Sequence, residues 1–148
     1  MSPFDSWLIL RGIKTLGVRL EKQQQNALVI AKWLCSNKNV TKVNYAGLPE
    51  HKGHNILQSQ ASGFGAMISF NVRNKSIVEK VLEKVRLVLF AESLGGVESL
   101  ITYPVVQTHS AIPVKIRQKL GVVDTLLRLS VGIEAVEDII ADLEQALE

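Results

Sequence analysis

The sequence predicts an α/β (α+β) fold, a two-layer sandwich in which helices cover one face of a small mixed or antiparallel sheet. Alternation of apolar and polar residues over 66–72 and 125–131 indicates half-buried strands. Apolar residues at helical spacing over 4–36, 75–85 and 134–147 indicate amphipathic helices. Strands and helices are intermixed along the chain, and a sheet with helices on one side satisfies that order.

The chain is predicted to begin with one long helix over residues 4–36, or with two nearly continuous helices over the same range. Ser2 is a typical helix cap and Pro3 suits a first helical turn. A kink is expected at Gly12 or Gly17, because glycine disfavours helix interiors. The residues expected to face the core form one stripe: Ile13, Leu16, Leu20, Ala27, Ala31 and Leu34.

The remaining elements follow from turn residues and from periodicity. The elements expected before the Gly95–Gly96 turn are a strand at 40–45, a short polar helix at 51–61, a strand at 66–72, a helix at 75–85 and a strand at 87–91. The elements expected after that turn are a strand at 98–103, a short helix at 113–120, a strand at 125–131 and a closing helix at 134–147.

Length and composition favour one globular domain spanning residues 1–148, with no repeat or linker. The net charge of +3 and the 5% aromatic content do not predict nucleic-acid binding. No apolar run is long enough to span a membrane and no signal peptide is recognisable, so a cytoplasmic location is expected. The mean hydropathy of +0.17 is high for a small monomer, which leaves apolar surface for a partner.

Arg128 is the first candidate binding residue. If Leu127 and Leu129 face the helices, Arg128 stands on the uncovered face of the sheet. A guanidinium there can hold a carboxylate through two parallel hydrogen bonds. The alternative interpretation is a surface arginine paired with a nearby acid.

The segment from Ala91 to Leu100 is the second candidate. Its glycines would let backbone amides approach the same carboxylate, together with Ser93 and Leu94. Glu92 would lie at the rim, facing a substrate amine. The alternative interpretation is an ordinary hairpin turn.

No metal site is predicted. His51, His54 and His109 lack the further ligands and outer partners that zinc needs. Cys35 is expected to be a small buried residue rather than a nucleophile. No Ser-His-Asp arrangement can be recognised in the sequence.

Several short segments resemble the C-terminal domain of the Cys/Met-metabolism family of pyridoxal-phosphate (PLP) enzymes, which have fold type I. The family includes cystathionine γ-synthase, cystathionine β- and γ-lyases, methionine γ-lyase and O-acetylhomoserine sulfhydrylase. The resemblance covers essentially the whole chain. The matching segments are Ser2–Trp7, Leu10–Leu16, Gly47–Pro49, Gly53–His54, Gly63–Gly65, Ala91–Leu100, Thr108–His109, Leu129–Glu134 and Asp138–Leu147.

The resemblance implies a role for each candidate residue. Arg128 would grip the substrate α-carboxylate, with help from Ser93 and Leu94. Glu92 and Thr108 would lie near the substrate side chain. In a full-length enzyme PLP would act as the electron sink while Arg128 orients the amino acid for proton abstraction.

The resemblance also implies that the larger N-terminal PLP-binding domain is missing, including its Schiff-base lysine. This chain alone is therefore expected to contain no catalytic residue, to hold no PLP covalently and to be inactive. Its expected partners are an amino-acid substrate, the PLP-binding domain and further copies in a homo-oligomer.

The Ser93–Leu94 pair favours cystathionine γ-synthase, which replaces the γ-substituent of an activated homoserine with cysteine. Cystathionine β- or γ-lyase and methionine γ-lyase are the alternatives within the family. A non-catalytic remnant that serves as an oligomerisation or binding module is the alternative from another class.

Overall fold

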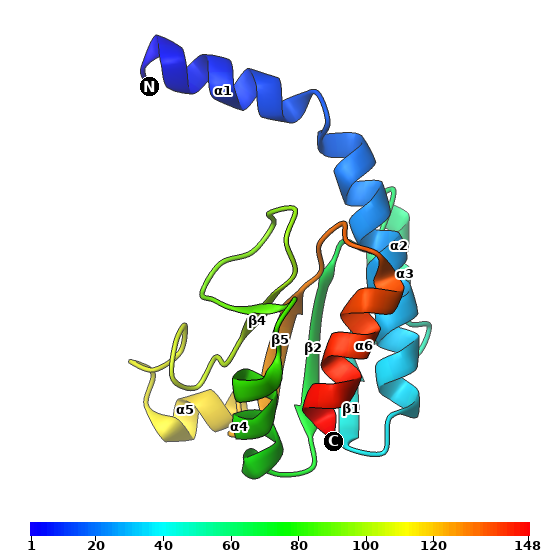
Figure 1. Cartoon of the computed structure of the whole chain (residues 1–148), viewed down its shortest axis with the longest axis vertical. Coiled ribbons are helices and arrows are strands. Elements are labelled where there is room, and N and C mark those ends of the chain that lie inside the picture. Colours follow the sequence, from blue (N-terminus) through cyan, green and yellow to red (C-terminus); the bar gives the residue numbers. More distant parts are fainter.

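A five-stranded mixed sheet organises the molecule (Figure 1). The computed structural model describes residues 1–148. In sheet order the strands are β1 (Val40–Asn44), β2 (Met67–Val72), β5 (Leu126–Ser130), β4 (Leu100–Thr102) and β3 (Leu89–Phe90). All neighbours are antiparallel except β3 and β4, which are parallel. The prediction of a small mixed sheet combined with helices is confirmed.

Six helices accompany the sheet. They are α1 (Pro3–Ile13), α2 (Leu16–Ser36), α3 (His54–Gln60), α4 (Lys75–Lys84), α5 (Val114–Lys119) and α6 (Val136–Leu147). The buried residues of α2, α4 and α6 share one core cluster with the sheet, and Figure 1 shows α2 and α6 running side by side along it. The opposite face of the sheet carries none of these long helices.

Two central strands build the core through their alternation. Ile68 pairs with Leu129 and Phe70 pairs with Leu127, and all four side chains are fully buried. Each intervening residue points to the other face, because successive strand residues alternate. Ser69 and Arg128 are therefore cross-strand neighbours on the open face.

Of the two arrangements predicted for residues 4–36, the structure shows the second, two helices separated at Lys14 and Thr15. No residue of α1 is buried, and in Figure 1 it extends away from the sheet. The predicted stripe faces the core only in its second half, where Ala27, Ala31 and Leu34 are fully buried. Its first half, Ile13, Leu16 and Leu20, is exposed. None of the helices is long and apolar enough to cross a membrane.

The hairpin interpretation of the Gly95–Gly96 segment is wrong. Leu89 pairs with Leu100 and Phe90 with Ile101 in parallel, so the chain must return to the same end of the sheet before β4 begins. Residues 91–99 form the loop that makes this return.

A buried carboxylate anchors the segment that precedes β3. Asp142 on α6 accepts hydrogen bonds from the backbone N–H groups of Arg86, Leu87 and Val88 at 2.9 Å each. We expect Asp142→Ala to lower the free energy of unfolding by about 3 kcal/mol, because three donors lose a charged acceptor. Urea denaturation measures this. The exposed Asp138→Ala is the control, with an expected loss below about 1 kcal/mol, and equal losses for both variants would contradict the anchor.

Candidate functional site

Arg128 stands on the open face of the sheet, as predicted. Its Nη2 donates a long hydrogen bond of 3.4 Å to Oγ1 of Thr102 on the neighbouring strand. Its Nε is buried and has no hydrogen-bond partner. Buried donors are normally satisfied, so this guanidinium has hydrogen-bonding capacity that the chain itself leaves unused. The alternative of an arginine paired with an acid is wrong, since neither ion pair of the structure includes Arg128.

A hollow of about 400 Å³ lies beside Arg128 on this face. It is lined by Lys42, Asn44, His51, Ser69, Asn71, Pro104, His109, Leu120, Gly121, Val122, Leu126 and Arg128. The lining contains no aspartate or glutamate, so the positive charges that it presents are not neutralised locally. It also contains no phenylalanine, tyrosine or tryptophan on which a pyridine ring could stack. These residues fit a carboxylate and do not fit the PLP ring.

The loop 91–99 is fastened to the strand that carries Arg128. The backbone N–H of Gly95 donates to Oγ of Ser130, two residues beyond Arg128, at 3.1 Å. The carboxylate of Glu134 accepts from both the backbone N–H and the hydroxyl of Ser99, at 2.6 and 3.0 Å. Ile133 also donates its N–H to the carbonyl of Val97 at 2.9 Å. The loop is thereby held at the edge of the open face.

The structure brings fewer of the predicted residues together than the sequence suggested. Glu92, Ser93 and Leu94 are exposed in the loop and do not line the hollow. Thr108 is exposed as well, and its hydroxyl lies 2.7 Å from Nδ1 of His109, which does line the hollow. The roles that the resemblance implies for these four residues stay predictions.

Sequence reasoning missed the polar side chains of β1 and β2 that surround the hollow. Cα pairing places Asn44, Ser69, Arg128 and Thr102 in one row across four strands. The signal was present, because Lys42 and Asn44 alternate with apolar Val43, as Ser69 alternates with Ile68 and Phe70. What the sequence did not show is which strands are neighbours.

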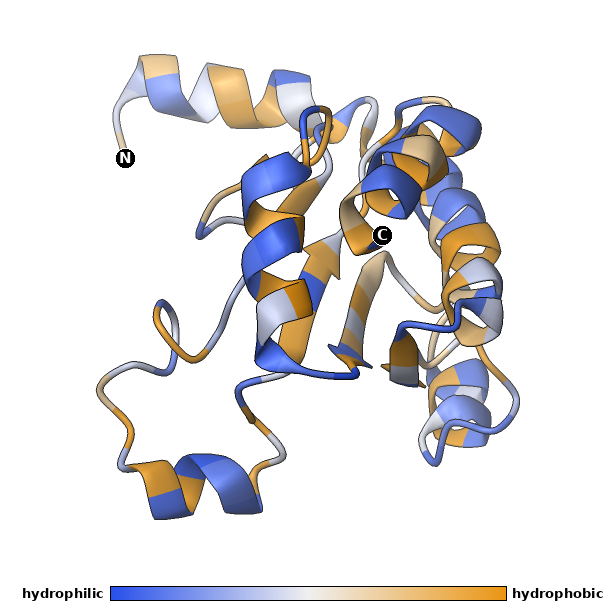
Figure 2. Ribbon diagram, turned by 60° about the horizontal axis from the view of Figure 1, so that its bottom comes forward, coloured by the Kyte–Doolittle hydropathy of each residue, from blue (hydrophilic) through white to orange (hydrophobic).

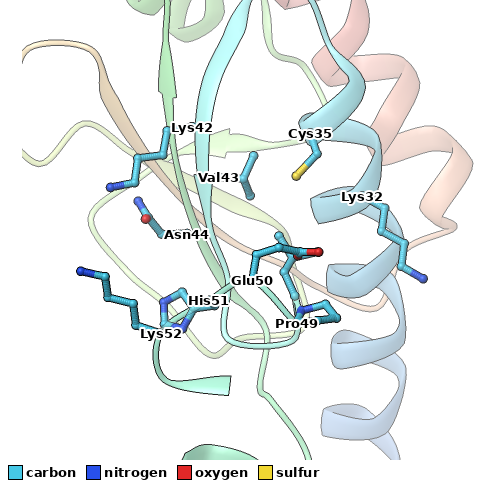
Figure 3. Close-up of a pocket in the computed structure, with 10 residues that line it drawn as sticks. Lys32, Cys35, Lys42, Val43, Asn44, Pro49, Glu50, His51 and Lys52 are labelled. Atoms are coloured by element: carbon cyan, nitrogen blue, oxygen red, sulfur yellow. The ribbon is translucent and has the colours of Figure 1, made fainter. Parts of the chain in front are cut away.

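A larger hollow of about 650 Å³ adjoins β1 and shares Lys42, Asn44 and His51 with the first (Figure 3). Cys35 lines it and is exposed, so the expectation of a buried cysteine is wrong: its helical position faces outward beside Lys32 rather than the core. Partial desolvation and then the charge of Glu50 raise the pKa of the Cys35 thiol. A raised pKa disfavours the reactive thiolate.

The three histidines lie in different surroundings. His54 stacks on Phe64 with ring centroids 4.7 Å apart, and its Nδ1 lies 2.8 Å from the carbonyl oxygen of Ala46. His51 and His109 both line the hollow beside Arg128. No group of three or more His, Cys, Asp or Glu side chains is placed to hold a metal ion.

Tyr45 directly follows β1, and its side chain is buried. Its hydroxyl donates to the carbonyl of Gly65 at 2.9 Å, and burial raises its pKa to about 12. The ring also lies against Gly47, where an added Cβ would come within 2.9 Å of the ring carbon Cζ. The turn after β1 therefore requires glycine at position 47.

Comparison with known proteins identifies the family. The model of the family described as Cys/Met metabolism PLP-dependent enzyme matches residues 1–148. Cystathionine beta-lyase of Lactococcus lactis subsp. cremoris (strain MG1363) is 49% identical over 148 residues, which are 100% of this chain and 39% of that enzyme. Cystathionine gamma-lyase of Dictyostelium discoideum is 49% identical over 148 residues, covering 99% of this chain and 38% of that enzyme.

A solved structure agrees with these sequence relatives. Cystathionine gamma synthase from Xanthomonas oryzae pv. oryzae, in complex with cystathionine, superposes with a TM-score of 0.94 at 45% identity, covering 99% of this chain and 38% of that one. The chain thus spans about two fifths of the length of the relatives that it matches. The chain belongs to the Cys/Met metabolism family of PLP-dependent enzymes.

Proposed function

We propose that these residues form the C-terminal, substrate-binding domain of a cytoplasmic PLP-dependent transsulfuration enzyme. Arg128 binds the α-carboxylate of the amino-acid substrate. The observation that carries this proposal is the buried Arg128 Nε without a partner, beside a hollow that has no acidic side chain. A carboxylate placed there would accept two parallel hydrogen bonds from the guanidinium.

The loop 91–99 supplies the other side of the proposed site. Its attachment to Ser130 keeps it next to the strand of Arg128. Ser93 and Leu94 would contact the carboxylate, whereas Glu92 and Thr108 would lie toward the substrate side chain. All four side chains are exposed and Glu92 engages no ion pair, which leaves the residues of the loop available to a ligand.

The cofactor belongs to the part of the enzyme that lies outside these 148 residues. The hollow beside Arg128 does not fit the PLP ring, whereas the family depends on PLP. The exposed apolar side chains of α1, including Phe4, Trp7 and Leu10, are the proposed contact with that part. Figure 2 shows apolar segments alternating with hydrophilic ones along this helix, which stands away from the sheet.

Cystathionine γ-synthase is the member of the family that we propose, with cystathionine β- and γ-lyase as the alternatives. The support for the synthase is the Ser93–Leu94 pair. Relatives named as β-lyase, γ-lyase and γ-synthase are all 45 to 50% identical to this chain, so identity does not separate the three reactions. The thiol that is formed or consumed separates the three reactions. β-Elimination from cystathionine leaves homocysteine, γ-elimination leaves cysteine, and the synthase consumes cysteine.

A chimeric enzyme tests the proposal. The matching 148 residues of the Lactococcus lactis cystathionine β-lyase would be replaced with this chain, and cystathionine cleavage would be measured. We expect an active chimera in which Arg128→Ala raises KM about 10- to 100-fold, since a charged hydrogen-bond partner is lost. The exposed Arg86→Ala is the matched control. A chimera that shows PLP absorbance and retains its KM in Arg128→Ala would contradict the assignment.

A further inference from the structure

Three consecutive glutamines on α2 have different surroundings. Gln23 is only 3% exposed, whereas Gln25 is exposed and its side chain hydrogen-bonds only to Glu21 of the same helix. Successive helix residues point about 100° apart, so the first glutamine faces the interior and the third faces outward. The Gln23 amide needs a partner there, because burying an unpaired amide costs free energy.

That partner belongs to the loop 91–99. Nε2 of Gln23 donates to the carbonyl oxygen of Gly96, 73 residues later in the chain. The preceding residue, Gly95, donates its backbone N–H to Oγ of Ser130 at 3.1 Å. One bond therefore joins the glycine pair to α2, and the other bond joins it to β5.

Asn26 holds the far end of the same loop. It lies three residues after Gln23 on the same face of α2 and is 2% exposed. Its Nδ2 donates to the carbonyl oxygens of Gly132 and Glu134, at 3.1 and 2.9 Å. Because the Glu134 carboxylate accepts both donors of Ser99, Asn26 fixes the group that binds the last residue of the loop. Helix α2 thus holds the loop at two points.

The loop depends on these bonds for its position. Apart from Ser99, none of the residues 91–99 is buried. A segment with few buried apolar contacts moves easily unless hydrogen bonds restrain it. The bonds to α2 and β5 therefore decide where Ser93 and Leu94 lie relative to Arg128.

We propose that Gln23 is a positioning residue of the carboxylate site: by binding the carbonyl of Gly96 it keeps Ser93 and Leu94 beside Arg128. The inference rests on the proposed function and adds to it a residue on α2 that touches no substrate. Gln23 does not line the hollow of Arg128, so it acts through the loop. Loss of its N–H donor releases the loop and weakens carboxylate binding, while the guanidinium stays in place.

Gln23→Met tests this role, because methionine is similar in size and shape and has no N–H to donate. L-norleucine is titrated into the ¹⁵N-labelled chain by NMR. We expect the variant to bind norleucine about 3- to 10-fold more weakly, since the loop is held by one hydrogen bond fewer. Beyond the neighbours of the substitution, amide shifts should appear at residues 91–99.

Two further variants serve as controls. Gln25→Met makes the same change on the exposed side of the helix and should alter neither the affinity nor the loop amides. Gln23→His restores a donor, because an imidazole protonated on Nε2 carries an N–H at a similar distance from the backbone. Its affinity for norleucine should be close to that of the wild type.

Urea denaturation of the same variants separates positioning from a purely structural role. If Gln23→Met lowers the free energy of unfolding while the folded variant binds norleucine with wild-type affinity, Gln23 only stabilises the fold and the inference is overturned. Equal weakening in Gln23→His and Gln23→Met would also overturn it, because the N–H would then not be the group that holds the loop.

Arg128→Ala distinguishes failure of this inference from failure of the proposed function. Norleucine binding that needs Arg128 but not Gln23 would remove the positioning role and keep the carboxylate site. If norleucine binding is unaffected by Arg128→Ala, or if the wild-type chain does not bind norleucine, the proposed function fails and the positioning role fails with it.

Discussion

Arg128→Ala is expected to weaken binding of amino-acid ligands to the isolated chain by about 10- to 100-fold. The guanidinium is the group on the open face whose buried Nε lacks a partner, and its hollow contains no acid that could replace a ligand carboxylate. NMR titration with L-norleucine measures the effect. Pentylamine, which is norleucine without its carboxylate, should bind weakly to the wild type and should not distinguish it from the variant.

Arg128→Lys tests the geometry of the contact. Lysine keeps the positive charge but cannot form two parallel hydrogen bonds. We expect an affinity between those of the wild type and Arg128→Ala, whereas the exposed Arg86→Ala should bind norleucine normally. Full affinity in Arg128→Lys would show that charge alone holds the carboxylate, and full affinity in Arg128→Ala would remove Arg128 from the site.

Gly132→Ala is expected to destabilise the fold by about 1 to 3 kcal/mol, because the backbone of the loop 91–99 passes directly over this residue. An added Cβ would lie 2.6 Å from the carbonyl carbon of Glu98 and even closer to the carbonyl oxygen of Val97. Neither can move freely, since Ile133 donates to Val97 and the backbone N–H of Gly132 donates to Oγ of Ser99 at 2.9 Å. The loop that carries Glu92, Ser93 and Leu94 must shift.

Urea denaturation and the amide shifts of residues 91–99 measure the two consequences of Gly132→Ala. Gly12→Ala is the matched control, because the Cβ that it would add meets nothing within 4 Å apart from its chain neighbours and the backbone of its own helix. Alanine favours helices over glycine by about 1 kcal/mol, so that control should leave stability unchanged or raise it. If both variants have similar free energies of unfolding and the loop amides do not shift, the loop accommodates the added Cβ without loss of stability, which would contradict the prediction.

Several elements were predictable because their signal is local. The alternation around Ile68 and around Arg128 predicted β2 and β5, and helical periodicity predicted α4 and α6. The family resemblance could also be recognised from short segments of the sequence, and the match of the family model over residues 1–148 confirms the family. In each case neighbouring residues along the chain carry the information.

Other features depend on residues that are distant in sequence. The exposure of Ile13, Leu16 and Leu20 could not be predicted, because their periodicity continues that of the buried half of α2. The Gly95–Gly96 segment resembles a hairpin turn locally. Its parallel strands follow from the position of β4 between β3 and β5.

The sequence by itself determined which residues face inward on β2, β5, α4 and α6, the placement of Arg128 on the uncovered face, and the family. Tertiary structure alone decided which strands are neighbours. That order aligns Asn44, Ser69, Arg128 and Thr102 in one row and brings Lys42 and His51 to the hollow of Arg128. The physical reason is that periodicity records the direction of a side chain relative to its own element, whereas a binding site is a relation between elements joined by long-range packing.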